Sequence, residues 1–152
     1  MLRILICCGG GASSGFFALN IEKQVKQLKL EDKVYAQCSA FGRMYQVYDQ
    51  FDIAMLCPHL RYQIPKVLKD HPEINIPLYV IPPKMYGTMR IEDIVQDALD
   101  MIKAFDLKKG NLVHFPNEDE SVRIDRPYSY RRSVLKEKND IYHSLEEFER
   151  SK

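Results

Sequence analysis

Short apolar runs alternate with longer segments of helical periodicity over the first two-thirds of the chain. The run at residues 2–7 ends in glycines and is typical of a strand that is covered on both faces. Three further runs predict strands, at residues 33–38, 51–57 and 77–81. Between and after these strands, helical patterns begin in the Ser13-Ser14 region and at Phe41, Pro65 and Ile91.

The alternation of strand and helix defines the expected fold class. Strand, helix, strand, helix at this spacing indicates βαβ units, so we expect an α/β fold with a parallel sheet, right-handed crossovers and helices on both faces. Such sheets bind ligands at the carboxyl ends of their strands. The candidate loops are therefore residues 7–14, 38–41, 57–62 and 82–88.

The apolar pattern changes after Leu107. Glycine, an acidic run and an Arg/Tyr-rich stretch follow, so we expect a main domain at residues 1–107 and a C-terminal extension at residues 108–152. Four apolar positions in the extension predict an amphipathic helix of about ten residues: Ile141, Tyr142, Leu145 and Phe148. This helix either docks on the main domain or forms an arm for a partner, and the pattern leaves both alternatives open.

Composition excludes several classes of protein. A chain of 152 residues buries roughly 68–70% of its unfolded surface, which is enough for a hydrophobic core. The formal net charge of +1, from 22 Lys and Arg against 21 Asp and Glu, disfavours both disorder and a basic nucleic-acid binder. Arginine and tyrosine interleave at residues 126–132, as in some RNA binders, but nearby acidic residues cancel their field.

The sequence also indicates the cellular compartment. Its apolar stretches are too short for a signal peptide or a transmembrane helix, so we expect neither export nor direct membrane insertion. Four cysteines are too few for a disulfide scaffold in a chain of this length. We therefore expect a cytoplasmic protein, in which a pair such as Cys7-Cys8 is reactive rather than structural.

The loop after the first strand has the composition of an anion-binding site. Consecutive glycines carry no Cβ atoms, so several backbone N–H groups can turn toward one anion at the amino end of a helix. No acidic side chain lies between Leu5 and Asn20. The same surroundings lower the pKa of a thiol, which makes Cys8 a candidate nucleophile. The candidate phosphate cradle comprises Gly9, Gly10, Gly11, Ala12, Ser13 and Ser14.

Other phosphate-binding loops fit this segment less well. No Lys follows the glycines as a Walker-type loop requires, and Gly9, Gly11 and Ser14 match the dinucleotide pattern only loosely. A cysteine phosphatase with a C-x5-R loop that begins at Cys8 needs Arg where Ser14 stands. A loop that binds a phosphoryl group on sulfur without this Arg is better suited to passing the group on than to hydrolysing it.

The order of these motifs resembles a known family, the IIB component of the lactose/cellobiose class of the bacterial phosphoenolpyruvate-dependent sugar phosphotransferase system. The family's first loop runs Cys-Ser-Ala-Gly-Met-Ser-Thr-Ser. The similar features here are the Cys-x4-Ser loop that starts at Cys8, Pro58 with Tyr62 and Pro65 after the third strand, and Tyr86-Gly87 after the fourth. The resemblance covers roughly residues 2–105, and Cys57-Pro58-His59 stands where the family has Gly-Pro-Gln.

The resemblance implies both a fold and a function. It implies a four-stranded parallel sheet with flanking helices, of the kind also found in low-molecular-weight phosphatases. It further implies a cysteine that accepts a phosphoryl group from a histidine of the IIA component and passes it to a sugar held by the membrane-embedded IIC component. Aligned on the serines, this cysteine falls on Cys8, residues 9–14 form the cradle, and no metal or nucleotide is required. The implied rim comprises Pro58, His59, Tyr86 and Gly87.

Two alternatives remain open. The same fold can serve as a regulatory module that is itself phosphorylated, or as a cysteine-based phosphatase or reductase.

The remaining cysteines and His59 support separate hypotheses. We expect Cys7 to pack within its strand. A parallel sheet brings the ends of neighbouring strands together, so Cys8, Cys38 and Cys57 are expected near one another, but a metal site is disfavoured because the chain has no C-x2-C pair. A reversible Cys8–Cys57 disulfide requires Cα atoms within about 7 Å. His59 is expected to contact the first loop at the position where the family has Gln.

Overall fold

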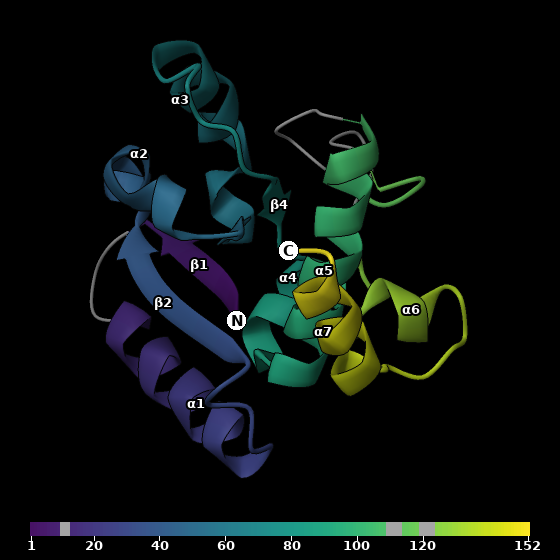
Figure 1. Ribbon diagram of the computed structural model, residues 1–152. Coiled ribbons are helices and arrows are strands. Elements are labelled where there is room, and N and C mark those ends of the chain that lie inside the picture. The colour runs from purple at the N-terminus through teal and green to yellow at the C-terminus, as the bar shows by residue number, and fades with distance from the viewer. Residues whose placement is uncertain (10–12, 109–113, 119–123) are drawn as a thin grey trace.

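The chain forms a parallel sheet flanked by helices (Figure 1). The computed structural model describes residues 1–9, 13–108, 114–118 and 124–152. Its strands are β1 (Leu2–Cys8), β2 (Val34–Ala40), β3 (Ile53–Leu56) and β4 (Leu78–Val80). They pair in the order β2-β1-β3-β4 and each pairing is parallel, as the alternation of strand and helix predicted.

β1 lies inside the sheet because its side chains are apolar on both faces. All its residues except Arg3 are buried. Cys7 pairs with Ser39 of β2 and with Leu56 of β3, so the carboxyl ends of three strands meet at one edge. β2 extends past the predicted 33–38 because it pairs with β1 along its whole length, whereas the outer strand β4 is shorter than predicted.

Helices connect the strands, and several are short. The α-helices are α1 (Ser13–Gln27), α2 (Met44–Val47), α3 (Ile64–Asp70), α4 (Pro83–Thr88), α5 (Ile91–Lys108), α6 (Tyr130–Ser133) and α7 (Ile141–Arg150). The 3-10 helices are η1 (Phe41–Arg43), η2 (Tyr48–Gln50) and η3 (Pro58–Gln63). The helix predicted to begin at Phe41 is divided into η1, α2 and η2.

Two segments that were expected as loops, residues 57–62 and 82–88, are largely helical. Pro58 and Pro83 each stand at the start of a helix, where proline's fixed φ is favourable and its missing N–H costs nothing. Both helices therefore begin directly at the carboxyl edge of the sheet.

The helices cover the two faces of the sheet. Figure 1 shows α1 and α5 on one side and α2 and α3 on the other. Gln24 of α1 links its neighbours, because its Nε2 donates to the Met89 carbonyl (2.8 Å) and its Oε1 accepts from the Ile91 N–H (2.8 Å). These bonds fix the junction between α4 and α5 from the α1 side.

The end of the chain packs back on the domain. The sequence prediction of an amphipathic helix is confirmed by α7, which buries Ile141 and Leu145 against α5 and β1. The Tyr142 hydroxyl donates to the Leu28 carbonyl at 3.1 Å. Of the two alternatives for this helix, the structure has the docked one. The domain boundary at residue 107 stays a prediction. In the described ranges, no helix is both long and apolar enough to cross a bilayer.

Candidate functional site

Cys8 and Cys57 lie side by side at the carboxyl edge of the sheet. Cys7 pairs with Leu56, and the Cys57 N–H donates to the Cys7 carbonyl at 3.0 Å. Cys8 and Cys57, which follow these two residues in the sequence, are therefore neighbours, because adjacent strands are about 4.8 Å apart. This spacing meets the distance condition for a Cys8–Cys57 disulfide, which itself stays a prediction; all four cysteines are present as free thiols.

Two hydrogen bonds act on the Cys8 sulfur. The hydrogen bond from the Cys57 thiol lowers the pKa of Cys8 most, and a second bond from the Tyr86 hydroxyl lowers it further. Burial acts in the opposite direction, and the pKa of Cys8 is lowered to about 7. About half of Cys8 is then thiolate at pH 7. The contact with Cys8 raises the pKa of Cys57, and burial raises the pKa of Tyr86. Both partners therefore stay protonated and donate hydrogen bonds to the Cys8 thiolate.

The other two cysteines are not activated. Cys7 is fully buried, and burial raises the pKa of its thiol. Burial also raises the pKa of Cys38 to about 11, with a further contribution from the nearby Cys8. Among the four cysteines, all of them in the described part of the chain, Cys8 is the one whose pKa is lowered.

His59 lies against the start of the first loop. A Cβ atom placed on Gly9 would lie 3.1 Å from His59 Nε2. Gly9 and His59 are both exposed, so the glycine lets the imidazole ring approach the backbone of the loop. The predicted role of His59 as a contact of this loop stays a prediction.

The remaining predicted site residues are placed only in part. Gly10, Gly11 and Ala12 lie outside the described residues. Ser13 and Ser14 begin α1, but their side chains also lie outside the described part, so the phosphate cradle stays a prediction.

On the predicted rim, Pro58 begins η3, and Gly87 is exposed in α4, where a Cβ atom would have no described residue within 4 Å. Within the described part of the chain, no three His, Cys, Asp or Glu side chains gather in a way that could hold a metal ion.

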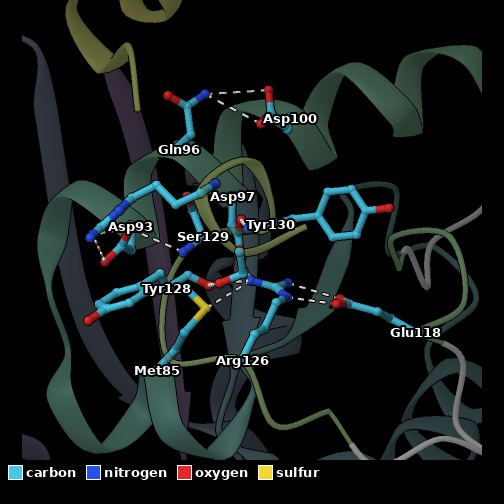
Figure 2. Close-up of polar contacts among 12 residues, drawn as sticks. Met85, Asp93, Gln96, Asp97, Asp100, Glu118, Arg126, Tyr128, Ser129 and Tyr130 are labelled. Carbon is cyan, nitrogen blue, oxygen red and sulfur yellow. Dashed lines mark hydrogen bonds and ion pairs between the residues drawn. The ribbon is translucent and has the colours of Figure 1, made fainter. Parts of the chain in front are cut away.

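A buried polar cluster around Arg126, which the sequence did not predict, reaches α4 from the C-terminal segment (Figure 2). Arg126 is 8% exposed. Its contacts are Nε to Glu118 Oε2 (2.7 Å), Nη1 to Asp97 Oδ2 (2.9 Å) and the Tyr128 carbonyl (2.8 Å), and Nη2 to Glu118 Oε1 (2.9 Å) and the Tyr79 hydroxyl (2.6 Å). Tyr79 in turn donates to Asp97 at 2.8 Å. We call Tyr79, Asp97, Glu118 and Arg126 the Arg126 cluster.

A polar stripe on α5 receives this segment. It consists of Asp93, Gln96, Asp97 and Asp100 at helical spacing. Asp97 Oδ1 also accepts from the Tyr130 N–H (2.8 Å), and Asp100 pairs with Arg131 (3.0 Å). Burial raises the pKa of Asp97 to about 6 although Arg126 opposes the shift. Four polar residues beside the apolar face of a predicted helix were the available signal for this contact, together with the Arg-rich stretch that follows.

These observations define a class of protein, a parallel α/β domain that carries a low-pKa thiol at the carboxyl end of its first strand. Residues 3–97 match the sequence profile of the family described as PTS system, Lactose/Cellobiose specific IIB subunit. The chain belongs to this family, and the resemblance noted in its sequence is confirmed.

One solved structure supports the same fold. The solution structure of the cellobiose-specific phosphotransferase IIB component protein from Borrelia burgdorferi is 30% identical, covers 72% of this chain and 95% of its own, and superposes with a TM-score of 0.53. The lactose-specific IIB component domain of the phosphoenolpyruvate:carbohydrate phosphotransferase system from Streptococcus pneumoniae is 22% identical. It covers 53% of this chain and 75% of its own, with a TM-score of 0.43. A search among curated proteins found no match. The predicted fold class, a four-stranded parallel sheet with flanking helices, is confirmed.

Proposed function

We propose that this protein is a phosphocarrier that works in the cytoplasm. Cys8 accepts a phosphoryl group from a phosphohistidine of the IIA component and passes it to a sugar of the lactose/cellobiose class that the membrane-embedded IIC component holds. The observation that carries the proposal is the position and state of Cys8, which ends β1 and has a pKa lowered to about 7 by two neutral donors. Membership of the IIB family supports the choice of donor and acceptor.

The chemistry of both steps follows from a thiolate of moderate pKa. In the first step the Cys8 sulfur attacks phosphorus in line, the S–P bond forms as the P–N bond breaks, and the imidazole leaves with the bonding pair and takes a proton from solvent. In the second step a sugar hydroxyl attacks phosphorus, the O–P bond forms as the S–P bond breaks, the hydroxyl proton passes to solvent, and Cys8 leaves as thiolate. A pKa near 7 suits both steps, because the same sulfur must be a nucleophile first and a leaving group afterwards.

The residues around Cys8 receive roles in this proposal. Backbone N–H groups of residues 9–14 hold the phosphoryl oxygens, with the amino end of α1 favouring their negative charge. His59, whose ring lies next to Gly9, serves as a rim residue of the same loop. Tyr86 and Cys57 keep Cys8 ionised before transfer and stabilise it again as it leaves.

The proposal is tested by intact-mass measurement after incubation with phosphoenolpyruvate, the general phosphotransferase proteins and a IIA component. We expect a gain of one phosphoryl group that is lost in Cys8→Ser. Cys38→Ser is the matched control, because Cys38 is a more exposed thiol on the neighbouring strand with a raised pKa, and it should gain the group as the parent does.

Other outcomes assign other functions. No mass gain, or a gain that persists in Cys8→Ser, would overturn the assignment of Cys8. A phosphorylated protein that gives no sugar phosphate with IIC-containing membranes would be a regulatory module. Release of inorganic phosphate from phosphorylated Cys8 would indicate a phosphatase, which Ser14 at the position of the phosphatase Arg disfavours.

A further inference from the structure

The helix that carries Tyr86 cannot hold its own position. α4 comprises six residues, Pro83–Thr88, and a helix this short has no independent stability in water. The direction of the Tyr86 hydroxyl therefore depends on what α4 packs against. Met85, the residue before Tyr86, is 1% exposed and is the buried anchor of this helix.

Arg126 contacts this anchor directly. Its Nη1 lies 3.1 Å from the Met85 sulfur, a weak acceptor, and Figure 2 shows the two side chains meeting next to Asp97. Arg126 is itself fixed, because each of its nitrogens has an oxygen acceptor and its guanidinium lies 5.2 Å from the ring centroid of Phe115. Because the Arg126 side chain is held in place, it gives Met85 a rigid surface to pack against.

The same segment also touches the end of α4. Met89 caps this helix in the left-handed region (φ 46°), and Arg90 follows it. The Arg90 guanidinium lies 5.1 Å from the centroid of the Tyr128 ring, whose other neighbour is Arg132 at 3.9 Å. Residues 126–132 thus contact α4 near Met85 and at its carboxyl end.

We propose that Arg126 is a positioning residue for Cys8: by fixing Met85, it holds the turn of α4 that directs the Tyr86 hydroxyl at the Cys8 sulfur. The functional meaning of this positioning rests on the phosphocarrier role proposed above. It makes the C-terminal segment a support of the site, although the family match ends at Asp97, the residue that Arg126 binds.

The test is a titration of the Cys8 thiolate by its ultraviolet absorbance. Each variant is compared with the same variant carrying Cys8→Ser, so that the difference reports Cys8 alone. We expect Tyr86→Phe to raise the midpoint by about one pH unit, since it removes a hydrogen bond to the charged sulfur. Arg126→Gln should raise the midpoint in the same direction. The double variant should show no further rise, because both changes act through one contact.

Arg131→Gln is the matched control. Arg131 lies on the same segment and pairs with Asp100 of α5 at 3.0 Å, so the substitution removes an ion pair from the same helix without removing the contact to Met85. Its midpoint should equal that of the parent. Circular dichroism establishes which variants are folded. If Arg126→Gln does not fold, Glu118→Gln, which removes the charge of Arg126's bidentate partner, decides by the same criteria.

Three results would overturn the proposal. They are an unchanged midpoint in the folded Arg126 or Glu118 variant, additive shifts in its double variant with Tyr86→Phe, and an unchanged midpoint in Tyr86→Phe itself. The titration needs no phosphoryl donor. A protein that is not phosphorylated on Cys8 would therefore refute the proposed function while the titration still decides whether Arg126 positions Tyr86.

Discussion

The two polar regions of this molecule, Cys8 with its donors and the Arg126 cluster, hold negative charge in opposite ways. In the Arg126 cluster two carboxylates are bound by a cation and by hydrogen bonds of fixed geometry. At Cys8 the groups that lower the pKa are a thiol and a phenol, both neutral. A charge that is fully paired builds a rigid support, whereas a charge that is held by neutral donors can leave its site to form a bond.

The difference also explains why the two regions lie next to each other. Neutral donors act on a thiolate only if they are aimed at it, and Tyr86 stands on a helix that is too short to aim it alone. Met85, the residue before Tyr86, contacts the rigid side chain of Arg126. Four predictions examine this contrast.

The largest expected effect is the loss of the thiolate by oxidation. Hydrogen peroxide should join Cys8 and Cys57, because the two thiols give up two protons and two electrons, the S–S bond forms, and peroxide is reduced to two molecules of water. Phosphoryl acceptance should then fall to background and return after treatment with a dithiol reductant. Peptide mass mapping identifies the bond, and Cys57→Ala should form none.

A disulfide that joins any other pair of cysteines would contradict the strand register of Cys8 and Cys57. So would oxidation of the parent chain that leaves both of these thiols free.

The next largest effect concerns the Arg126 cluster. Arg126→Met should lower the free energy of unfolding by about 3–5 kcal/mol, because it leaves the buried Asp97 and Glu118 without their cation. Arg131→Gln removes a more exposed pair than those of Arg126 and should cost less than about 1 kcal/mol. Urea denaturation measures both. Equal losses in the two variants would show that the burial of an ion pair does not determine how much its removal lowers the free energy of unfolding.

A smaller effect is expected when a neutral donor is removed from Cys8. Cys57→Ala should raise the pKa of Cys8 at least as far as Tyr86→Phe does, because Cys57 makes the larger contribution. A lowered pKa keeps the thiolate present as the pH falls to about 7, so its loss shifts the titration to higher pH. A rise of one unit would reduce the thiolate fraction at pH 7 about fivefold.

The rate of alkylation by iodoacetamide, followed against pH, measures this change, and Cys38→Ser serves as the control with an unchanged profile. A smaller shift in Cys57→Ala than in Tyr86→Phe would reverse the order of the two donors.

The sequence was sufficient for the fold but not for the cluster that supports the site. Buried strands and helices have strong periodic patterns, and the run at residues 2–7 or the stripe on α5 could be identified without a partner. The neighbourhood of Cys8 and Cys57 followed from parallel pairing alone. The cluster depends on which face of α5 meets Arg126, and that contact joins residues 29 positions apart. The polar positions of the predicted helix and the Arg/Tyr-rich stretch are both visible in the sequence, but local patterns do not specify that the two pair with each other.

The smallest expected effect compares the two exposed glycines beside the site. Gly87→Ala should raise the free energy of unfolding by about 0.5–1 kcal/mol, because it lies in α4 with no described residue within 4 Å of the added methyl group. Gly9→Ala should change it by less than about 0.5 kcal/mol, since among the described residues the methyl group would meet the exposed His59 ring at 3.1 Å, and a flexible side chain can move aside. Thermal and urea unfolding measure both. A loss of more than about 1 kcal/mol in Gly9→Ala that is restored by adding His59→Ala would show instead that this ring is held firmly over the loop, and that the reactive region has a rigid contact of its own.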